Sequence, residues 1–308
     1  MELRAAYRFL FKGQAGTTLR ALIVLLLSFR VLVCDAAFAE TSSPAELKST
    51  NKLIVGVFPR RGFKQTLQIF SPLATYLQTG LGRPVELWAA ADYTTFERHL
   101  AAEEYDLVHL NQSQYIKARD RSGYDAIIQN EEFGEPSLRA AIFVRADSGI
   151  DSLQDLRGKT IAFGGNKDAM VSYIIPTFLM RKANILEGDY KEKFASNPPS
   201  ALMSMIIRES EAAGAGEKRL QLPLIAKRIA PGSVKALAVS DAFSHLPWAV
   251  HPRVDPHTKA QLRDLLLALE ETEKGRKILS TAKLTGFNPA ADADYDMHRL
   301  ILDLMNAR

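Results

Sequence analysis

Short apolar runs alternate with amphipathic segments along the first part of the chain. The apolar runs have the length of strands and end at Pro, Gly or polar turns; they are residues 52–58, 84–88 and 105–110. Two segments between them have helical start signals or helical periodicity; they are residues 71–79 and 93–102. This alternation predicts an α/β fold with mostly parallel sheets covered by helices on both faces.

The same alternation continues to the end of the chain. Further strands are predicted at residues 137–144, 160–163 and 234–240. Helices are predicted at residues 151–156, 168–183, 198–209, 255–269, 270–279 and 295–305. The small residues 212–216 predict a tightly packed strand or turn.

The sequence DLRGKTIAFGG, residues 155–165, ends in a glycine turn. The pattern predicts a helix that ends at Gly158, a buried strand, and then a turn at Gly164 and Gly165 into a new helix. A strand that ends in glycines at a helix start offers backbone N–H groups and the positive end of the helix dipole. We therefore expect an anion-binding position here.

The first 39 residues have the pattern of an export signal. Cations at Arg4, Arg8, Lys12 and Arg20 precede an apolar core at residues 21–29. Small residues then precede a cleavage position after Ala39, which predicts a periplasmic location. The core is shorter than the ~20 residues that span a membrane. A retained amphipathic anchor is the alternative.

The net charge and the cysteine content exclude several classes of function. The formal net charge is +4, but the leader holds five Lys/Arg residues and two acidic ones, so the remaining chain is near +1. Nucleic-acid binding therefore has little electrostatic support. Cys34 is the only cysteine and lies in the leader, which excludes disulfides, thiolate metal sites and cysteine nucleophiles from the processed chain.

Several motifs have the order and spacing of one known family. They are residues 56–59, 72–77, 81–82, 92–93, 106–107, 147–150 and 155–159, together with Pro176, Ser240 and Pro247. In these features the chain resembles the phosphate/phosphite/phosphonate periplasmic binding proteins of ABC importers. The resemblance implies the type II periplasmic-binding-protein fold, with two α/β lobes that close on a small ligand. Lobe 1 would be residues 45–138 plus 240–308 and lobe 2 residues 139–239, with crossings near residues 142–144 and 237–239.

The sequence departs from this family where the ligand is expected. The family's oxyanion-binding hydroxyl run corresponds to Ala169, Met170, Val171 and Ser172, of which only Ser172 has a hydroxyl. The family's ligand-facing aspartate corresponds to Ala212, and a common aromatic corresponds to Leu138. Each lost contact to a charged group is worth about 1.5–3 kcal/mol. The resemblance therefore implies an altered ligand site.

Two groups of residues are candidates to replace the missing contacts. Arg60 and Arg61 follow the first strand at its carboxyl end, where open α/β sheets place ligands. The turn and helix start supply Gly165, Asn166, Lys167, Asp168, Ala169, Met170 and Ser172. An Arg clamp with a helix start can hold an oxyanion or a carboxylate. The arginines are alternatively solvated loop charges.

A third group follows the strand at residues 105–110. His109, Asn111, Gln112 and Tyr115 are expected along the side wall of the cleft. His109 with Met170 could bind a soft metal, but a structural role for a strand-end histidine is the alternative, and we assign no metal site.

These features predict a non-catalytic, secreted solute-binding protein for an ABC importer. The expected partners are a small anionic ligand and an ABC permease or membrane sensor; no cofactor or nucleic acid is expected, and the chain is expected to be a monomer. Hydrolase, nucleotide-loop, metalloprotease and dinucleotide motifs are absent from the sequence. Alternatives are a sensory or accessory protein with a more apolar cleft, or an enzyme of the same fold.

Overall fold

The computed structural model describes residues 52–59 and 62–307. The predicted export signal and the candidates Arg60 and Arg61 lie outside the described residues.

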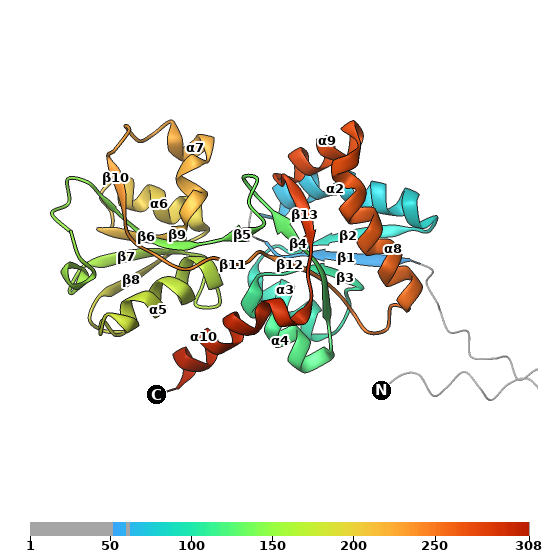
Figure 1. Cartoon of the computed structure of the whole chain (residues 1–308), viewed down its shortest axis with the longest axis horizontal. Helices are drawn as coiled ribbons and strands as arrows, with labels where there is room; N and C mark the ends of the chain where they lie inside the picture. The colour runs from blue at the N-terminus through green and yellow to red at the C-terminus, as the bar shows by residue number, and fades with distance from the viewer. Residues whose placement is uncertain (1–51, 60–61, 308) are drawn as a thin grey trace, which may run out of the picture. The chain divides into compact units, whose positions relative to one another are not determined.

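The first lobe is built on a six-stranded sheet with the order β13-β4-β12-β3-β1-β2 (Figure 1). Its strands are β1 (Leu53–Val57), β2 (Val85–Ala89), β3 (Leu107–His109), β4 (Asp125–Glu131), β12 (Pro247–Val250) and β13 (Gly286–Pro289). β1 to β4 run in one direction, and the two late strands β12 and β13 run in the opposite one.

Helices cover both faces of this sheet because each presents an apolar stripe to it. One face packs against α2 (Phe63–Leu81), α8 (Pro256–Leu267) and α9 (Glu273–Ala282), with the short turn η4 (Ala268–Glu271) between the last two. The other face packs against α3 (Tyr93–Ala101) and α4 (Gln112–Ser122).

The second lobe is built on a five-stranded sheet with the order β10-β6-β9-β7-β8. Its strands are β6 (Ala140–Arg145), β7 (Thr160–Gly164), β8 (Lys191–Ala195), β9 (Ala212–Gly216) and β10 (Val234–Val239). β6 alone runs against the other four. The covering helices are η1 (Leu153–Leu156), η2 (Met170–Ile174), α5 (Ile175–Lys182), α6 (Pro198–Ile206), η3 (Glu217–Gln221) and α7 (Pro223–Ala226).

The chain passes between the two sheets at a separate two-stranded sheet. It pairs β5 (Ser137–Leu138) with β11 (Phe243–Ser244) in antiparallel register. The crossings predicted near residues 142–144 and 237–239 lie instead within β6 and β10, where they pair with each other inside the second lobe. Residues 142–144 are fully buried in that sheet, whereas residues 237–239 lie on its edge strand and are partly exposed.

Several element boundaries differ from the sequence prediction. The first helix begins at Phe63, and Pro72 lies inside it. Ser71 turns its hydroxyl back to the Leu67 carbonyl, so the Ser-Pro pair does not start a new helix here. The helix predicted from residue 168 begins at Met170 with a π-helical turn, in which the Ile175 N–H bonds to the Met170 carbonyl. Several elements were not predicted, among them α4, β4, β8, β12 and β13.

The last helix, α10 (Asp296–Asn306), follows the turn η5 (Asp292–Tyr295) and contacts both lobes. Its first half packs on α4, and Ile301 lies in the core of the second lobe beside α5 (Figure 1). Arg181 of α5 donates to three carbonyls at the C-terminal end of α10: Leu304 (3.0 Å), Met305 (2.9 Å) and Ala307 (2.7 Å). The positive charge of Arg181 also interacts favourably with the negative, C-terminal end of the helix dipole.

His298 of α10 is fully buried between Phe243 and Tyr295. Neither of its ring nitrogens has a hydrogen-bond partner within the described residues. Burial lowers the pKa of His298 to about 4, because the charged ring would lose its hydration.

We expect Arg181→Met to lower the free energy of unfolding by about 1–3 kcal/mol, since three charge-assisted hydrogen bonds are lost. Urea denaturation measures this change, and amide exchange at residues 296–306 should accelerate in the same variant. The neighbouring Lys182→Met is the matched control and should stay within about 0.5 kcal/mol of the parent. Equal effects of both variants would contradict an anchoring role for Arg181.

We expect His298 to make stability depend on pH. Its pKa is about 4 in the folded chain and about 6.5 when unfolded, so only the unfolded chain gains this proton between those values. The contribution is complete above about pH 6.5 and is lost toward pH 4, by about 3 kcal/mol in total. Urea denaturation across this range should show a shallower pH dependence for His298→Leu, whereas parallel curves would refute the assignment.

Candidate functional site

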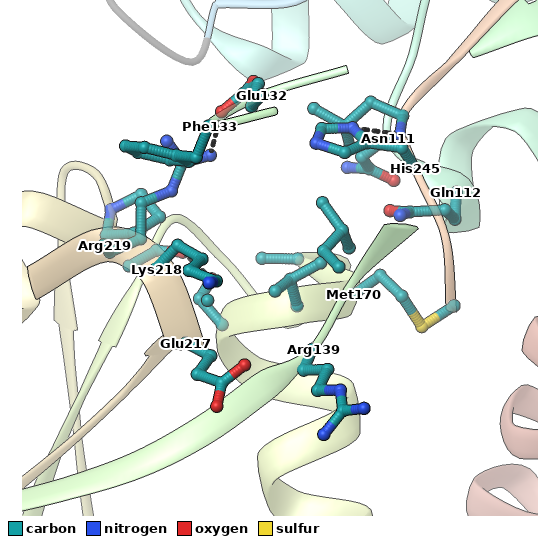
Figure 2. Close-up of a pocket in the computed structure, with 18 of the residues that line it drawn as sticks. Asn111, Gln112, Glu132, Phe133, Arg139, Met170, Glu217, Lys218, Arg219 and His245 are labelled. Carbon is teal, nitrogen blue, oxygen red and sulfur yellow. Dashed lines mark hydrogen bonds and ion pairs between the residues drawn. The ribbon is translucent and has the colours of Figure 1, made fainter. Parts of the chain in front are cut away.

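A cavity of about 420 Å³ lies between the two lobes and has walls from both (Figure 2). The first lobe contributes the start of α4, the turn after β4, and His245 with Leu246. The second lobe contributes Arg139, the start of η2 and the segment after β9. The walls thus include the amino ends of two helices and segments that follow the carboxyl ends of β4 and β9, where backbone geometry leaves polar groups for a ligand.

The helix start in the cavity is formed by Ala169, Met170, Val171 and Ser172. Ala169 is the N-terminal cap and provides no side-chain cap. The Ser172 hydroxyl donates to the Gly164 carbonyl, which fixes the helix start against the end of β7. This part of the wall therefore offers main-chain N–H groups and apolar side chains, as the sequence departures indicated.

The charged part of the wall comes mainly from the segment after β9. Arg219 pairs with the buried Glu132 of the first lobe at 2.9 Å, and its guanidinium carbon lies 5.8 Å from the Phe133 ring centre. Lys218 lies 3.5 Å from Glu135 of the same first-lobe turn. Two cations of the second lobe thus meet two carboxylates of the first across the cleft.

Arg139 and Glu217 also line the cavity, next to each other across the β6–β9 pair. The Glu217 N–H donates to the Arg139 carbonyl at 2.8 Å. Among the described residues, neither side chain has an ion-pair partner. Arg139 is therefore a cation of the wall that remains available to a ligand.

Asn111 and Gln112 are held in place at the start of α4. The Asn111 side-chain oxygen accepts from the Gln114 N–H (2.8 Å), and the Gln114 side chain accepts from the Asn111 N–H (3.1 Å), which is a capping box. The Gln112 amide nitrogen donates to the Ser244 carbonyl at 3.0 Å, which ties the wall to β11.

The structure brings five of the predicted site residues to the cavity. They are Asn111, Gln112, Ala169, Met170 and Ser172. Leu138, the position at which the resembled family has an aromatic residue, also lines it. The assignment of these residues to ligand binding stays a prediction.

Residues 165–168 form the turn before the helix start, and their polar groups bond to other parts of the protein. Gly165 has φ of 100°, which favours glycine, and its N–H donates to the Ala195 carbonyl at 2.8 Å. The Asn166 side chain accepts from the Asp168 N–H at 3.1 Å. Asp168 pairs with Lys117 of the first lobe at 2.6 Å. Lys167 pairs with Glu187 and Glu192, whose contacts raise the pKa of its ammonium.

His109 lies in the core of the first lobe, away from the cavity wall. Its ring stacks on Trp248 with centres 4.7 Å apart. Its Nδ1 lies 3.1 Å from the Pro247 carbonyl, and its Nε2 lies 3.3 Å from the Asn130 amide nitrogen. These contacts match the structural role that the sequence analysis kept as the alternative.

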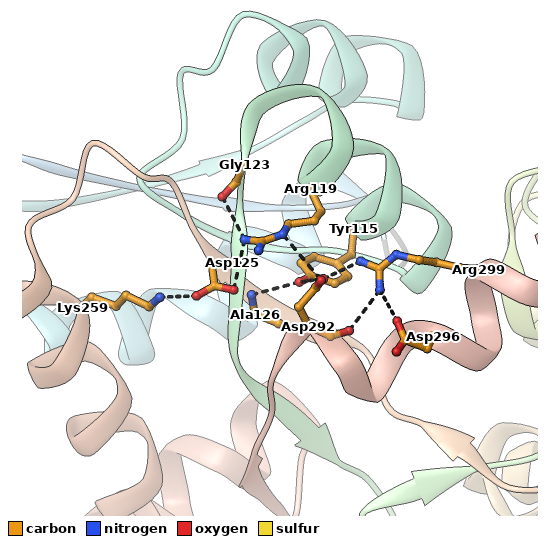
Figure 3. A network of polar contacts seen from close by, with 9 residues as sticks. All are labelled: Tyr115, Arg119, Gly123, Asp125, Ala126, Lys259, Asp292, Asp296 and Arg299. Carbon is orange, nitrogen blue, oxygen red and sulfur yellow. Dashed lines mark hydrogen bonds and ion pairs between the residues drawn. The ribbon is translucent and has the colours of Figure 1, made fainter.

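Tyr115 belongs to a separate polar network at the base of α10 (Figure 3). Its hydroxyl donates to Asp292 at 2.6 Å and accepts from the Ala126 N–H at 3.3 Å. Burial, followed by the Asp292 contact, raises the pKa of Tyr115. Arg299 bonds to Asp292 and Asp296, so this network fixes the start of α10 on the first lobe.

Sequence reasoning missed Arg139, Glu217, Lys218, Arg219 and Glu132. The sequence position of residues 217–219 could have indicated them, because they directly follow the small-residue strand β9. Open α/β sheets bind ligands at the carboxyl ends of their strands. Ala212, equated above with a ligand-facing aspartate, is instead buried within the second-lobe core at the other end of that strand.

Two further kinds of site are absent from residues 52–59 and 62–307. No helix there has the length and apolar content to cross a membrane. No group of three or more His, Cys, Asp or Glu residues is arranged to hold a metal ion there.

The family model described as "ABC transporter, phosphonate, periplasmic substrate-binding protein" matches residues 55–295. The chain belongs to this family. The resemblance inferred from the sequence motifs is thereby confirmed, and a small-molecule ligand and an ABC transporter partner are properties of the family.

Solved members share the fold of this phosphonate-type binding protein at low identity. A Prochlorococcus marinus protein in complex with methylphosphonate has 15% identity and a TM-score of 0.72, over 84% of this chain and 99% of that one. The binding component of a phosphonate ABC transporter from Pseudomonas aeruginosa has 17% identity and a TM-score of 0.68, over 82% and 85% of the two chains.

A Xanthomonas citri protein bound to chloride has 18% identity and a TM-score of 0.68, over 82% of this chain and 96% of that one. The likeness of this binding protein to these three structures confirms the predicted two-lobed fold. The sheets, predicted to be mostly parallel, are mixed, because β12 and β13 in the first lobe and β6 in the second run against their neighbours.

We expect the Glu132–Arg219 contact, which joins the two lobes, to contribute to the free energy of unfolding. A double-mutant cycle of Glu132→Gln and Arg219→Met should give a coupling energy of about 0.5–3 kcal/mol in urea denaturation, because each single variant removes one partner of this mostly buried pair. The exposed pair Lys193–Glu209 is the control and should couple by less than about 1 kcal/mol. Additive effects at Glu132 and Arg219 would contradict this expectation.

Proposed function

We propose that this binding protein closes on a small anionic ligand and delivers it to an ABC permease. The ligand would be a phosphonate, phosphite or phosphate-like oxyanion, or a carboxylate. Residues 45–138 with 240–308 and residues 139–239 would move as two bodies joined by β5 and β11. Ligand contacts with both lobes would favour the closed state, because only that state makes all of them.

The observation that carries this proposal is a helix start, residues 169–172, and a cation, Arg139, in the wall of one cavity between the lobes. Helix starts bind anions through main-chain N–H groups and the helix dipole, and a guanidinium binds oxyanions through paired hydrogen bonds. Together they replace the missing hydroxyls at Ala169, Met170 and Val171.

A sensory or accessory protein of the same fold is the second candidate. The apolar side chains of Leu138, Met170, Val171 and Leu246 line the cavity and favour a less polar ligand. In that case the partner would be a membrane sensor in place of a permease.

The proposal includes export and processing after Ala39, a periplasmic location and a monomeric state. It includes neither catalysis nor nucleic-acid binding. The family assignment and the near-neutral charge of residues 40–308 support these points.

The test uses the processed chain, purified without denaturation and examined by native mass spectrometry and thermal shift. The panel holds phosphate, phosphite, methylphosphonate, 2-aminoethylphosphonate and small carboxylates. A ligand at about 100 times its Kd should add about 2.7 kcal/mol of stability, visible as a higher melting temperature.

Arg139→Gln should weaken binding of the active anion by about 5- to 30-fold, the equivalent of about 1–2 kcal/mol for an exposed charge-assisted contact. Arg157→Gln, which loses a pair with Asp189 outside the cavity, is the control and should bind normally. Absence of stabilisation by every anion would refute the proposal and favour the sensory alternative.

A further inference from the structure

One end of the cavity carries a hydrogen-bond acceptor that has no partner. Gln112 lines the cavity, is 0% exposed, and directs its amide from α4 toward the interior (Figure 2). Its side-chain oxygen has no hydrogen-bond partner among the described residues. An unsatisfied buried acceptor is unfavourable, and a ligand that donates to it removes this penalty.

The orientation of the Gln112 amide follows from its other contact. The amide nitrogen donates to the Ser244 carbonyl at 3.0 Å. A carbonyl can only accept, so the nitrogen must face Ser244 and the oxygen must face away from it. The acceptor at this end of the cavity is therefore fixed by β11.

Asn111 supplies the complementary group beside it. Its side-chain oxygen is used by the Gln114 N–H at 2.8 Å. The group that Asn111 can offer to the cavity is then its amide NH₂, a donor. Asn111 is 6% exposed and lines the same cavity. Two adjacent residues thus present one acceptor and one donor, each oriented by a main-chain contact.

The side chains around this pair are apolar, except for the imidazole of His245, which lies beside Asn111 (Figure 2) and whose Nδ1 accepts from the Leu246 N–H at 2.8 Å. Met170 and Leu246, both buried, line the cavity together with Leu138. The charged side chains Arg139, Glu217 and Lys218 come from the second lobe and lie apart from Asn111 and Gln112 in the view of the cavity (Figure 2). The first-lobe end therefore suits a neutral polar group, since an ammonium in apolar surroundings loses its hydration.

We infer that Gln112 and Asn111 select an acid that carries, away from its charge, a neutral group that both donates and accepts a hydrogen bond. A hydroxyl or a carboxamide has both functions, whereas an ammonium has no acceptor and a methyl has neither. This inference rests on the proposed function, because it assigns the acidic end of the ligand to Arg139 and the helix start.

The test compares acids that differ only in this terminal group. Isothermal titration of the wild-type chain uses 2-hydroxyethylphosphonate, 2-aminoethylphosphonate and propylphosphonate, and in parallel 3-hydroxypropionate, 3-aminopropionate and butyrate. We expect the hydroxyl compound of the active series to bind at least about 10-fold more tightly than its methyl and ammonium counterparts. Equal or tighter binding of either counterpart overturns the inference. No binding by any of the six overturns this inference, and the proposed function still stands if phosphate or phosphite binds in the thermal-shift panel.

Gln112→Met tests the residue itself. The variant should lose the preference for the hydroxyl over the methyl compound while the methyl compound binds within about 3-fold of wild type. A merely structural role would weaken both compounds equally and would refute the assignment. Gln68→Met removes an exposed amide from α2, outside the cavity wall, and should leave the preference unchanged. The wild-type series decides the inference even if Gln112→Met does not fold.

Discussion

The close approach of the helix start to β9 determines the geometry of the second lobe. A Cβ at Gly214 would lie 2.4 Å from the Ser172 carbonyl oxygen, and a Cβ at Gly164 would lie 2.2 Å from the Pro198 nitrogen. Only glycine fits at both positions, so main-chain packing places residues 169–172 at the edge of the sheet. Among these four residues only Ser172 holds the helix start by a side-chain hydrogen bond, which explains how Ala, Met and Val can stand at the other three positions without loss of the helix start.

This arrangement divides recognition between the lobes. The second lobe offers main-chain N–H groups and Arg139, which are suited to an anion but discriminate little among acids. The first lobe offers Asn111 and Gln112, whose amides are oriented by main-chain contacts and are suited to a neutral polar group. In the function proposed above, selectivity among acids would therefore depend on the first lobe.

The sequence predicted the fold well where burial produces continuous apolar runs. β1, β6 and β7 followed from such runs, and the family motifs indicated their order. It failed where burial involves polar residues. α4 was missed because Gln112, Ser113 and Gln114 are buried but polar, so the helix has no apolar stripe at its start. β8 was missed because its sequence KEKFA is mostly charged and lies at a sheet edge.

The candidate site was predicted less completely because charge pairing depends on contacts that are distant in sequence. Lys167 and Asp168 were expected near the ligand from position alone, but each has a partner, Glu192 and Lys117, that periodicity cannot identify. Arg219 and Glu132 likewise meet only after both lobes are in place.

The contacts between the lobes differ in how strongly they restrain movement of one lobe relative to the other. Lys117–Asp168 is half exposed and screened, so it adds about 0–1 kcal/mol and can open readily. The Glu132–Arg219 contact is mostly buried. Separating the two side chains would expose their charges to water, and the hydration gained would compensate part of the lost attraction. α10 is different, because Arg181 holds its far end on the second lobe while Asp292 and Arg299 hold its start on the first. Any movement of the lobes must therefore bend or release this helix. The ligand contacts must supply enough differential binding energy to outweigh that restraint.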